Sequence, residues 1–227
     1  MPINRQLPEK NKEIEQGFYG ADRWITFDTL NYQGPLFGWG PSPPDQFTFG
    51  FIQEFVAQQE QPTFLVYLTQ NSHYPWTPLP PVLDDWRELE NIEMQNGVLS
   101  EAQKKGLSLG ESRRNYLQAV GNTLDALEEF ITSLDNENSI IVLIGDHPPP
   151  TVSRREDGFG TMVHIISQDV GFLESFHEYG FVDGLILENF EPTMRHEGLY
   201  SLFVRNLIAQ YGKSPWILPP YLPNGHQ

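Results

Sequence analysis

Three short apolar segments constrain the fold of this chain most strongly. They are TFLVYLT at residues 63–69, SIIVLI at residues 139–144 and TMVHIIS at residues 161–167. Their apolar residues follow one another almost without interruption, as in strands that are covered on both faces of a parallel sheet. We therefore predict three buried strands at these positions.

Amphipathic helices are predicted between these strands. Asp45 is the predicted N-cap of a helix over about 46–59, in which three phenylalanines recur at helical spacing. A long helix is predicted over 113–134, and one apolar stripe runs along it, formed by Tyr116, Val120, Leu124, Leu127, Ile131 and Leu134.

Two further helices are predicted after the third strand. Asp169 is the predicted cap of a short helix, and Leu199, Phe203 and Leu207 predict a helix near the C-terminus. Long helices that alternate with continuous apolar strands predict an α/β fold, in which a layered sheet carries helices on both faces.

The composition excludes several classes of protein. The chain has 14 Lys and Arg against 30 Asp and Glu, a net charge of −16, which argues against nucleic acid as a partner. It has no cysteine, which excludes disulfides and thiol nucleophiles. No apolar run reaches the roughly 18 residues that span a membrane, and residues 1–16 lack the apolar stretch of a signal peptide. We expect this chain by itself to be soluble.

Polar residues follow the ends of the first two predicted strands. His73 comes shortly after one strand, and Asp146 and His147 come directly after the other. Ligands in α/β sheets bind at the carboxyl ends of strands, so these side chains form a candidate site if the two strands are parallel neighbours. Asp and His are ordinary ligands of divalent transition metals. Alternatively, Asp146 accepts backbone hydrogen bonds in the next turn and His73 packs on a loop surface.

Three segments, taken in order, resemble a known family. They are FLVYLTQNSHYPWTPLP, RRNYLQAVGNTLDALEEFI and NSIIVLIGDHPPP. Together they are similar to the C-terminal half of the sulfatase-like hydrolases of the alkaline phosphatase superfamily. The likeness is greatest to bacterial membrane-anchored members, a group that includes the lipoteichoic acid synthases.

This resemblance implies an activity and a site. It implies an alkaline phosphatase-like fold and a metal-dependent hydrolase or phosphotransferase that acts on sulfate or phosphate esters of a small molecule or lipid headgroup. Asp146 and His147 would hold one divalent ion, which is Mn, Zn, Ca or Mg. His73 would contact the substrate oxyanion or the leaving group, and Trp24 would line the substrate pocket. Thr26 stands where the synthases have an arginine, which puts glycerol-phosphate recognition in doubt.

The resemblance also predicts how the chain is organised. We expect a polar lead-in over 1–16, a partial sulfatase-like catalytic domain over 17–212 and a Pro-rich tail over 213–227. The family's nucleophile and early acidic ligand would lie before residue 17, in an N-terminal half or membrane-anchored portion supplied elsewhere, and the parent catalytic domain would be extracytoplasmic. The alternatives are a catalytically inactive remnant or interaction module of the same fold, or one half of a split enzyme.

Aromatic and cationic residues near these loops have two interpretations each. Trp24, Trp39, Trp76 and Trp86 either bind a sugar or lipid headgroup or pack the loops onto the core. The pair Arg154–Arg155 either steers an anionic ester or is solvated.

Overall fold

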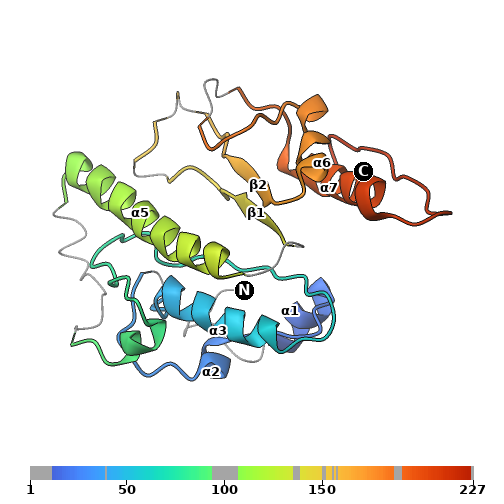
Figure 1. The fold of residues 1–227 in the computed structure, drawn as a ribbon. Helices are drawn as coiled ribbons and strands as arrows, with labels where there is room; N and C mark the ends of the chain where they lie inside the picture. The colour runs from blue at the N-terminus through green and yellow to red at the C-terminus, as the bar shows by residue number, and fades with distance from the viewer. Residues whose placement is uncertain are drawn as a thin grey trace. The chain divides into compact units, whose positions relative to one another are not determined.

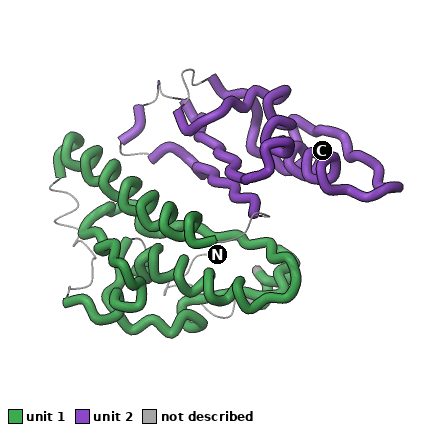
Figure 2. Tube along the Cα trace, viewed as in Figure 1, with its two compact units in different colours: residues 1–134 green, residues 135–227 purple. Residues whose placement is uncertain are grey.

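The computed structural model describes the chain as two compact units. The described residues are 12–38, 40–93, 107–134, 139–149, 152–154, 156, 158–186 and 191–225. Unit 1 comprises residues 1–134 and unit 2 comprises residues 135–227 (Figure 2). None of the described helices combines the length and the apolar character that crossing a membrane requires.

Unit 1 is helical in its described residues. Its elements, shown in Figure 1, are α1 (Lys12–Tyr19), α2 (Phe27–Leu30), α3 (Asp45–Ala57), the 3₁₀ helix η2 (Trp86–Glu90) and α5 (Leu109–Ser133). Helix α3 packs against both α5 and η2. The core beside α3 consists of Leu30, Tyr32, Leu36, Phe47 and Leu89. The Tyr32 hydroxyl donates to the carbonyl oxygen of Leu89 at 3.1 Å, which joins the segment after α2 to η2 across this core.

Helix α3 confirms the helix predicted over 46–59, but Asp45 is not its N-cap. Pro44 holds that position with extended backbone angles, φ −53° and ψ 140°, and Asp45 is the first helical residue. The first half of α3 is the buried half, and Phe47 and Phe49 are each 4% exposed. Asp45, as the first residue of this buried half, is therefore itself buried.

Helix α5 confirms the long predicted helix and begins four residues earlier than expected. Ser108 caps it: the Ser108 hydroxyl accepts from the backbone N–H of Glu111 at 3.3 Å, and the Glu111 carboxylate accepts from the Ser108 N–H at 2.8 Å. The buried residues of α5 are Ala119, Thr123 and Ala126, while Leu124 of the predicted stripe is 52% exposed. Small side chains line this face, so helix α3 can approach it closely.

The prediction of a strand over 63–69 is wrong. This segment belongs to no strand, and Phe64, Val66 and Leu68 are 89%, 60% and 52% exposed. Continuous apolar sequence favours a strand only where a second strand supplies the backbone partners. In the part of the chain that the structure describes, the sheet is formed by two other segments.

Unit 2 contains that sheet and the C-terminal helices. Its elements are β1 (Ile140–Ile144), β2 (Val163–Ser167), α6 (Val170–Glu174), the 3₁₀ helix η4 (His177–Tyr179) and α7 (His196–Tyr211) (Figure 1). The two strands confirm the second and third predicted strands, and they pair antiparallel with Ile140 opposite Ser167 and Ile144 opposite Val163. The core of the unit is formed by Phe172, Phe176 and Leu202.

The fold class is confirmed at the level of a mixed α/β chain. Asp169 caps α6 as predicted, because its carboxylate accepts from the backbone N–H of Phe172 at 2.9 Å. The described sheet is antiparallel and two-stranded, and residues 63–69 are not one of its strands. The domain over 17–212 stays a prediction. Helix α1 overlaps the predicted lead-in, whose residues 1–11 lie outside the described residues.

Candidate functional site

Asp146 and His147 follow the end of β1 in unit 2. Just after the strand, the Gly145 N–H donates to the Met162 carbonyl at 3.1 Å. Asp146 and His147 follow Gly145 and lie outside the strand. The Asp146 side chain is 78% exposed and the His147 side chain is 56% exposed. Both side chains are thus open to a dissolved ion or substrate.

The ring of His147 is held in one orientation. Its Nδ1 lies 3.0 Å from the Pro148 carbonyl oxygen, which can only accept, so Nδ1 carries the proton in the neutral ring. The other nitrogen, Nε2, lies 3.5 Å from Oδ2 of Asp146. Oδ1 of Asp146 accepts from the His147 backbone N–H at 2.8 Å. Oδ1 of Asp146 therefore binds the adjacent backbone, and Oδ2 faces the imidazole.

Gly145 packs closely against Thr161. Its φ is not in the left-handed region, but an added Cβ would lie 3.1 Å from Cβ of Thr161. Thr161 is also within 3.0 Å, through Oγ1, of Nε2 of His196 at the start of α7. The structure therefore brings Thr161 beside Gly145, and His196 beside Thr161. They are 35 residues apart, and no sequence pattern signalled that they meet.

His73 lies on an exposed turn of unit 1. Its backbone N–H donates to the Gln70 carbonyl at 3.2 Å, and its Nδ1 lies 2.9 Å from the Tyr74 carbonyl oxygen. As in His147, a carbonyl partner places the first proton on Nδ1. A hydrogen bond from Nε2 to an oxyanion would therefore require the doubly protonated, cationic ring.

Trp24 packs against helix α1 of unit 1. It is 9% exposed and stacks on Tyr19 of α1, with ring centroids 5.8 Å apart. His73 is held instead by Gln70 and Tyr74.

The other aromatic and cationic candidates have packing or surface contacts. Trp76 is 3% exposed and donates from Nε1 to the Ser72 carbonyl at 3.0 Å, and Trp86 packs edge-on against Phe47. These two residues pack loops onto the core. Arg154 lies 3.6 Å from Glu156 in an exposed ion pair, and Trp39 and Arg155 lie outside the described residues.

Asp45 is the residue whose surroundings the sequence did not anticipate. It is 1% exposed, and its carboxylate accepts four hydrogen bonds, from the Tyr67 hydroxyl (2.6 Å), the Gln70 N–H (2.8 Å), the Asn71 N–H (2.9 Å) and the Thr123 hydroxyl (3.3 Å). Burial raises the pKa of Asp45, against the opposing effect of these hydrogen bonds. Burial and the charge of Asp45 also raise the pKa of Tyr67 well above its ordinary value.

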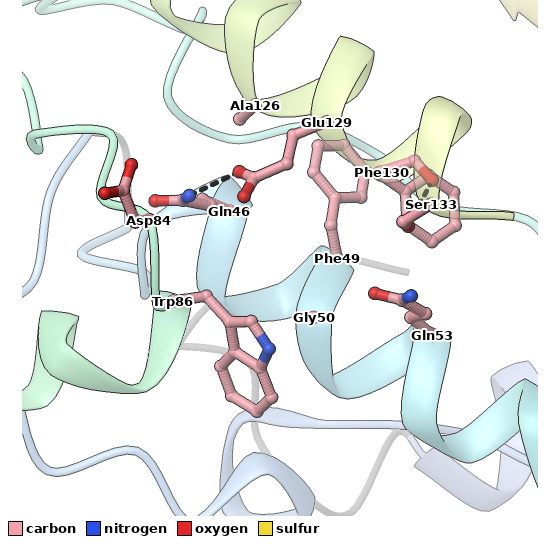
Figure 3. A pocket seen from close by; sticks show the side chains of 10 residues that line it. All are labelled: Gln46, Phe49, Gly50, Gln53, Asp84, Trp86, Ala126, Glu129, Phe130 and Ser133. Atoms are coloured by element: carbon pink, nitrogen blue, oxygen red, sulfur yellow. Dashed lines mark hydrogen bonds between the residues drawn. The ribbon is translucent and has the colours of Figure 1, made fainter.

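A cavity of about 210 Å³ lies between α3, α5 and η2 (Figure 3). Its apolar wall includes Phe49 and Phe130, whose rings stack at 5.1 Å, and Trp86. Its polar wall includes Gln46, which donates from Nε2 to the Glu129 carboxylate at 2.5 Å. The residues that line this cavity include none of the four predicted site residues.

Comparison with known proteins identifies the family. The family model described as Sulfatase matches residues 1–177, a range that contains Trp24, His73, Asp146 and His147. The chain belongs to the sulfatase family. Membership supports a sulfatase-like hydrolase, or a related function, within the alkaline phosphatase superfamily. Neither the curated proteins nor the solved structures compared with it include a match to this chain.

Sulfatase-family members usually use a divalent metal, and the Asp146–His147 pair of this sulfatase-family chain has a geometry that fits one. Two ligands that each lie about 2.1 Å from a tetrahedral ion are about 3.4 Å apart. The distance from Nε2 of His147 to Oδ2 of Asp146 is 3.5 Å. A carbonyl that fixes Nδ1–H, as Pro148 does, is the usual outer partner of a metal-binding histidine. Among the described residues, no group of three or more His, Asp or Glu side chains is placed to hold an ion.

Proposed function

We propose that this chain contributes to the active site of a metal-dependent, sulfatase-like enzyme that hydrolyses or transfers sulfate or phosphate esters. Asp146 and His147 bind one divalent ion, and His73 donates to the ester oxyanion. The observation that carries the proposal is the 3.5 Å distance between Nε2 of His147 and Oδ2 of Asp146, in a ring that Pro148 orients. The finer features of the fold that we propose are the alkaline phosphatase-like layering and the likeness to the bacterial membrane-anchored group.

The residues of this chain would divide the chemistry as follows. A bound divalent ion neutralises charge on the ester oxygens and on the attacking group. Asp146 contributes a negative oxygen ligand and His147 a neutral nitrogen ligand. A zinc-like ion takes four or more ligands, so the pair acts together with water, substrate or another protein segment. His73, when its ring is cationic, donates a charge-assisted hydrogen bond to the oxyanion.

The charge of the chain makes local cations important. The net charge of −16 repels an anionic ester at long range. Attraction must then come from local groups, which we propose are the bound ion and the His73 ring. The substrate that we propose is the sulfate or phosphate ester of a small molecule or lipid headgroup. Thr26, in place of the synthases' arginine, gives no support for glycerol phosphate itself.

Calorimetric titration with Mn²⁺ tests the metal assignment. Wild type is compared with Asp146→Ala and with Asp183→Ala, which removes an exposed carboxylate that also contacts a histidine, His177, at 3.1 Å. We expect Asp146→Ala to weaken Mn²⁺ binding about tenfold or more, the loss of roughly 1.4 kcal/mol, and Asp183→Ala to leave it unchanged. Equal binding by all three proteins would refute the assignment.

Turnover distinguishes the enzyme from its alternatives. Aryl sulfate and aryl phosphate esters are incubated with the chain and Mn²⁺, with His73→Gln as the comparison. Metal-dependent turnover that His73→Gln abolishes would support the proposed reaction. Metal binding without turnover would favour the inactive remnant, or a site that a second chain completes.

A further inference from the structure

His73 occupies the middle of a segment that is anchored on both sides. Downstream, the Trp76 N–H donates to the His73 carbonyl at 3.3 Å, and the Trp76 indole is buried against Tyr116 with ring centroids 5.5 Å apart. Upstream, the His73 N–H donates to the Gln70 carbonyl. The position of the imidazole therefore depends on what holds Gln70 and its neighbour Asn71.

Asp45 holds both of these residues through their backbones. Oδ1 of Asp45 accepts from the Gln70 N–H at 2.8 Å, and Oδ2 accepts from the Asn71 N–H at 2.9 Å. The contact with Asn71 is reciprocal, because Oδ1 of Asn71 accepts from the Asp45 N–H at 2.7 Å. Two successive backbone amides and one side chain are thus tied to a single residue of α3.

The base of this clamp is buried. Asp45 is the first residue of α3, whose buried half packs into the core of unit 1, and Asp45, Gln70 and Asn71 are 1%, 5% and 3% exposed. Hydrogen bonds to a buried carboxylate are stronger than those in water, because solvent does not compete for them. A carboxylate is rarely buried to this extent without a specific set of partners.

We propose that Asp45 is a positioning residue for His73, which it fixes in place through the Gln70–Asn71 backbone. This inference rests on the proposed function, because it is there that the His73 ring binds the oxyanion. Asp45 would hold that ring in position. An Asn at position 45 cannot do the same. Each carboxylate oxygen accepts one of the two backbone N–H groups, whereas an amide has one accepting oxygen and would point its NH₂ at the other N–H.

The test follows His73 directly by NMR. The chain is labelled with ¹³C at Cε1 of its six histidines, and the His73 signal is identified by its disappearance in His73→Gln. We expect the His73 signal to move or broaden in Asp45→Asn, while the other histidine signals stay in place. A folded Asp45→Asn protein with an unchanged His73 signal would overturn the proposal.

Two matched variants separate positioning from general loss of stability. Tyr67→Phe removes one hydrogen bond to Asp45 and keeps both backbone N–H bonds, and Asp125→Asn removes the same charge from an exposed site on α5. Both should leave the His73 signal at its wild-type position. A change in Tyr67→Phe as large as that in Asp45→Asn would show a merely structural role and overturn the proposal. If Asp45→Asn does not fold, Asn71→Ala, which removes the reciprocal bond from the Asp45 N–H, is compared with the wild type instead. A folded Asn71→Ala protein with an unchanged His73 signal would then overturn the proposal.

Inorganic phosphate separates this proposal from the proposed function. A His73 signal that shifts on addition of phosphate in the wild type, and shifts less in Asp45→Asn, supports both. A His73 signal that phosphate does not move refutes the oxyanion role of His73. The comparison of wild type with Asp45→Asn in the absence of phosphate then still decides whether Asp45 positions the ring.

Discussion

Replacing Gly50 by alanine should have two opposing effects on the free energy of unfolding. Higher helix propensity raises it, and a close contact with Trp86 lowers it. Gly50 lies inside α3, where alanine is favoured over glycine by about 1 kcal/mol. A Cβ at this position would lie well inside van der Waals contact of the Trp86 indole, against Cγ, Cδ2 and Cε2. Trp86 cannot move without cost, because it packs edge-on against Phe47 at 5.0 Å and its ring supports the Arg87 guanidinium at 4.3 Å.

The magnitude follows from these two contributions. Overpacking of this kind costs about 1–3 kcal/mol, and the gain in helix propensity offsets about 1 kcal/mol of it. Gly50→Ala should therefore lower the free energy of unfolding by up to about 2 kcal/mol. Gly121 in α5 is the matched control, since a Cβ there would meet nothing within 4 Å. Gly121→Ala should raise the free energy of unfolding by up to about 1 kcal/mol.

Urea denaturation followed by far-UV circular dichroism measures both variants. The difference between them isolates the contact with Trp86, because the propensity gain is common to both. A double-mutant cycle with Trp86→Leu checks the assignment: without the indole, Gly50→Ala should become stabilising. The reasoning is refuted if Gly50→Ala is as stable as Gly121→Ala, or if the cycle shows no coupling between positions 50 and 86.

Two further predictions concern a buried carboxylate and a helix cap. Burial raises the pKa of Asp45 above its ordinary 3.8, so the folded state holds this proton more tightly than the unfolded chain. As the pH rises from the ordinary pKa of Asp45 through its raised pKa, the wild type should therefore lose stability relative to Asp45→Asn. The loss is at most about 1.4 kcal/mol per pH unit. Parallel pH profiles of the two proteins in urea denaturation would contradict this. Ser108→Ala removes the cap of α5 and should cost about 1 kcal/mol of stability, whereas Ser108→Thr should cost less; equal midpoints for both variants would show that the cap is dispensable.

Local sequence signals predicted the helices well. The apolar spacing in α3 and the capping Asp169 each act within one turn of helix. The Ser-x-x-Glu capping pattern at 108–111 is of the same kind, but the prediction did not use it and began the helix at residue 113. The antiparallel strands at 140–144 and 163–167 were also visible as short apolar runs. Their direction was not, because the orientation of a strand pair depends on the path of the chain between the strands.

The errors arise where a second element decides the outcome. Residues 63–69 have the composition of a buried strand, but composition does not provide a neighbouring backbone. On α5 the largest apolar residues predicted the buried stripe, whereas Ala119, Thr123 and Ala126 face the interior. Close helix packing selects small side chains at the contact, and hydrophobicity alone does not show where that contact falls.

The sequence by itself determined the family and the residue types of the candidate site. The Gly-Asp-His segment after an apolar strand and the His73 loop could be recognised because the residues that form each of them are neighbours in the sequence. Only the tertiary structure decided that Pro148 orients the His147 ring, that Thr161 lies against Gly145 and that Asp45 holds the backbone before His73. These contacts depend on atoms of different turns and elements that meet only when the chain folds. Burial then makes the Asp45 carboxylate, which the sequence indicated as an ordinary helix cap, the anchor of the loop that carries His73.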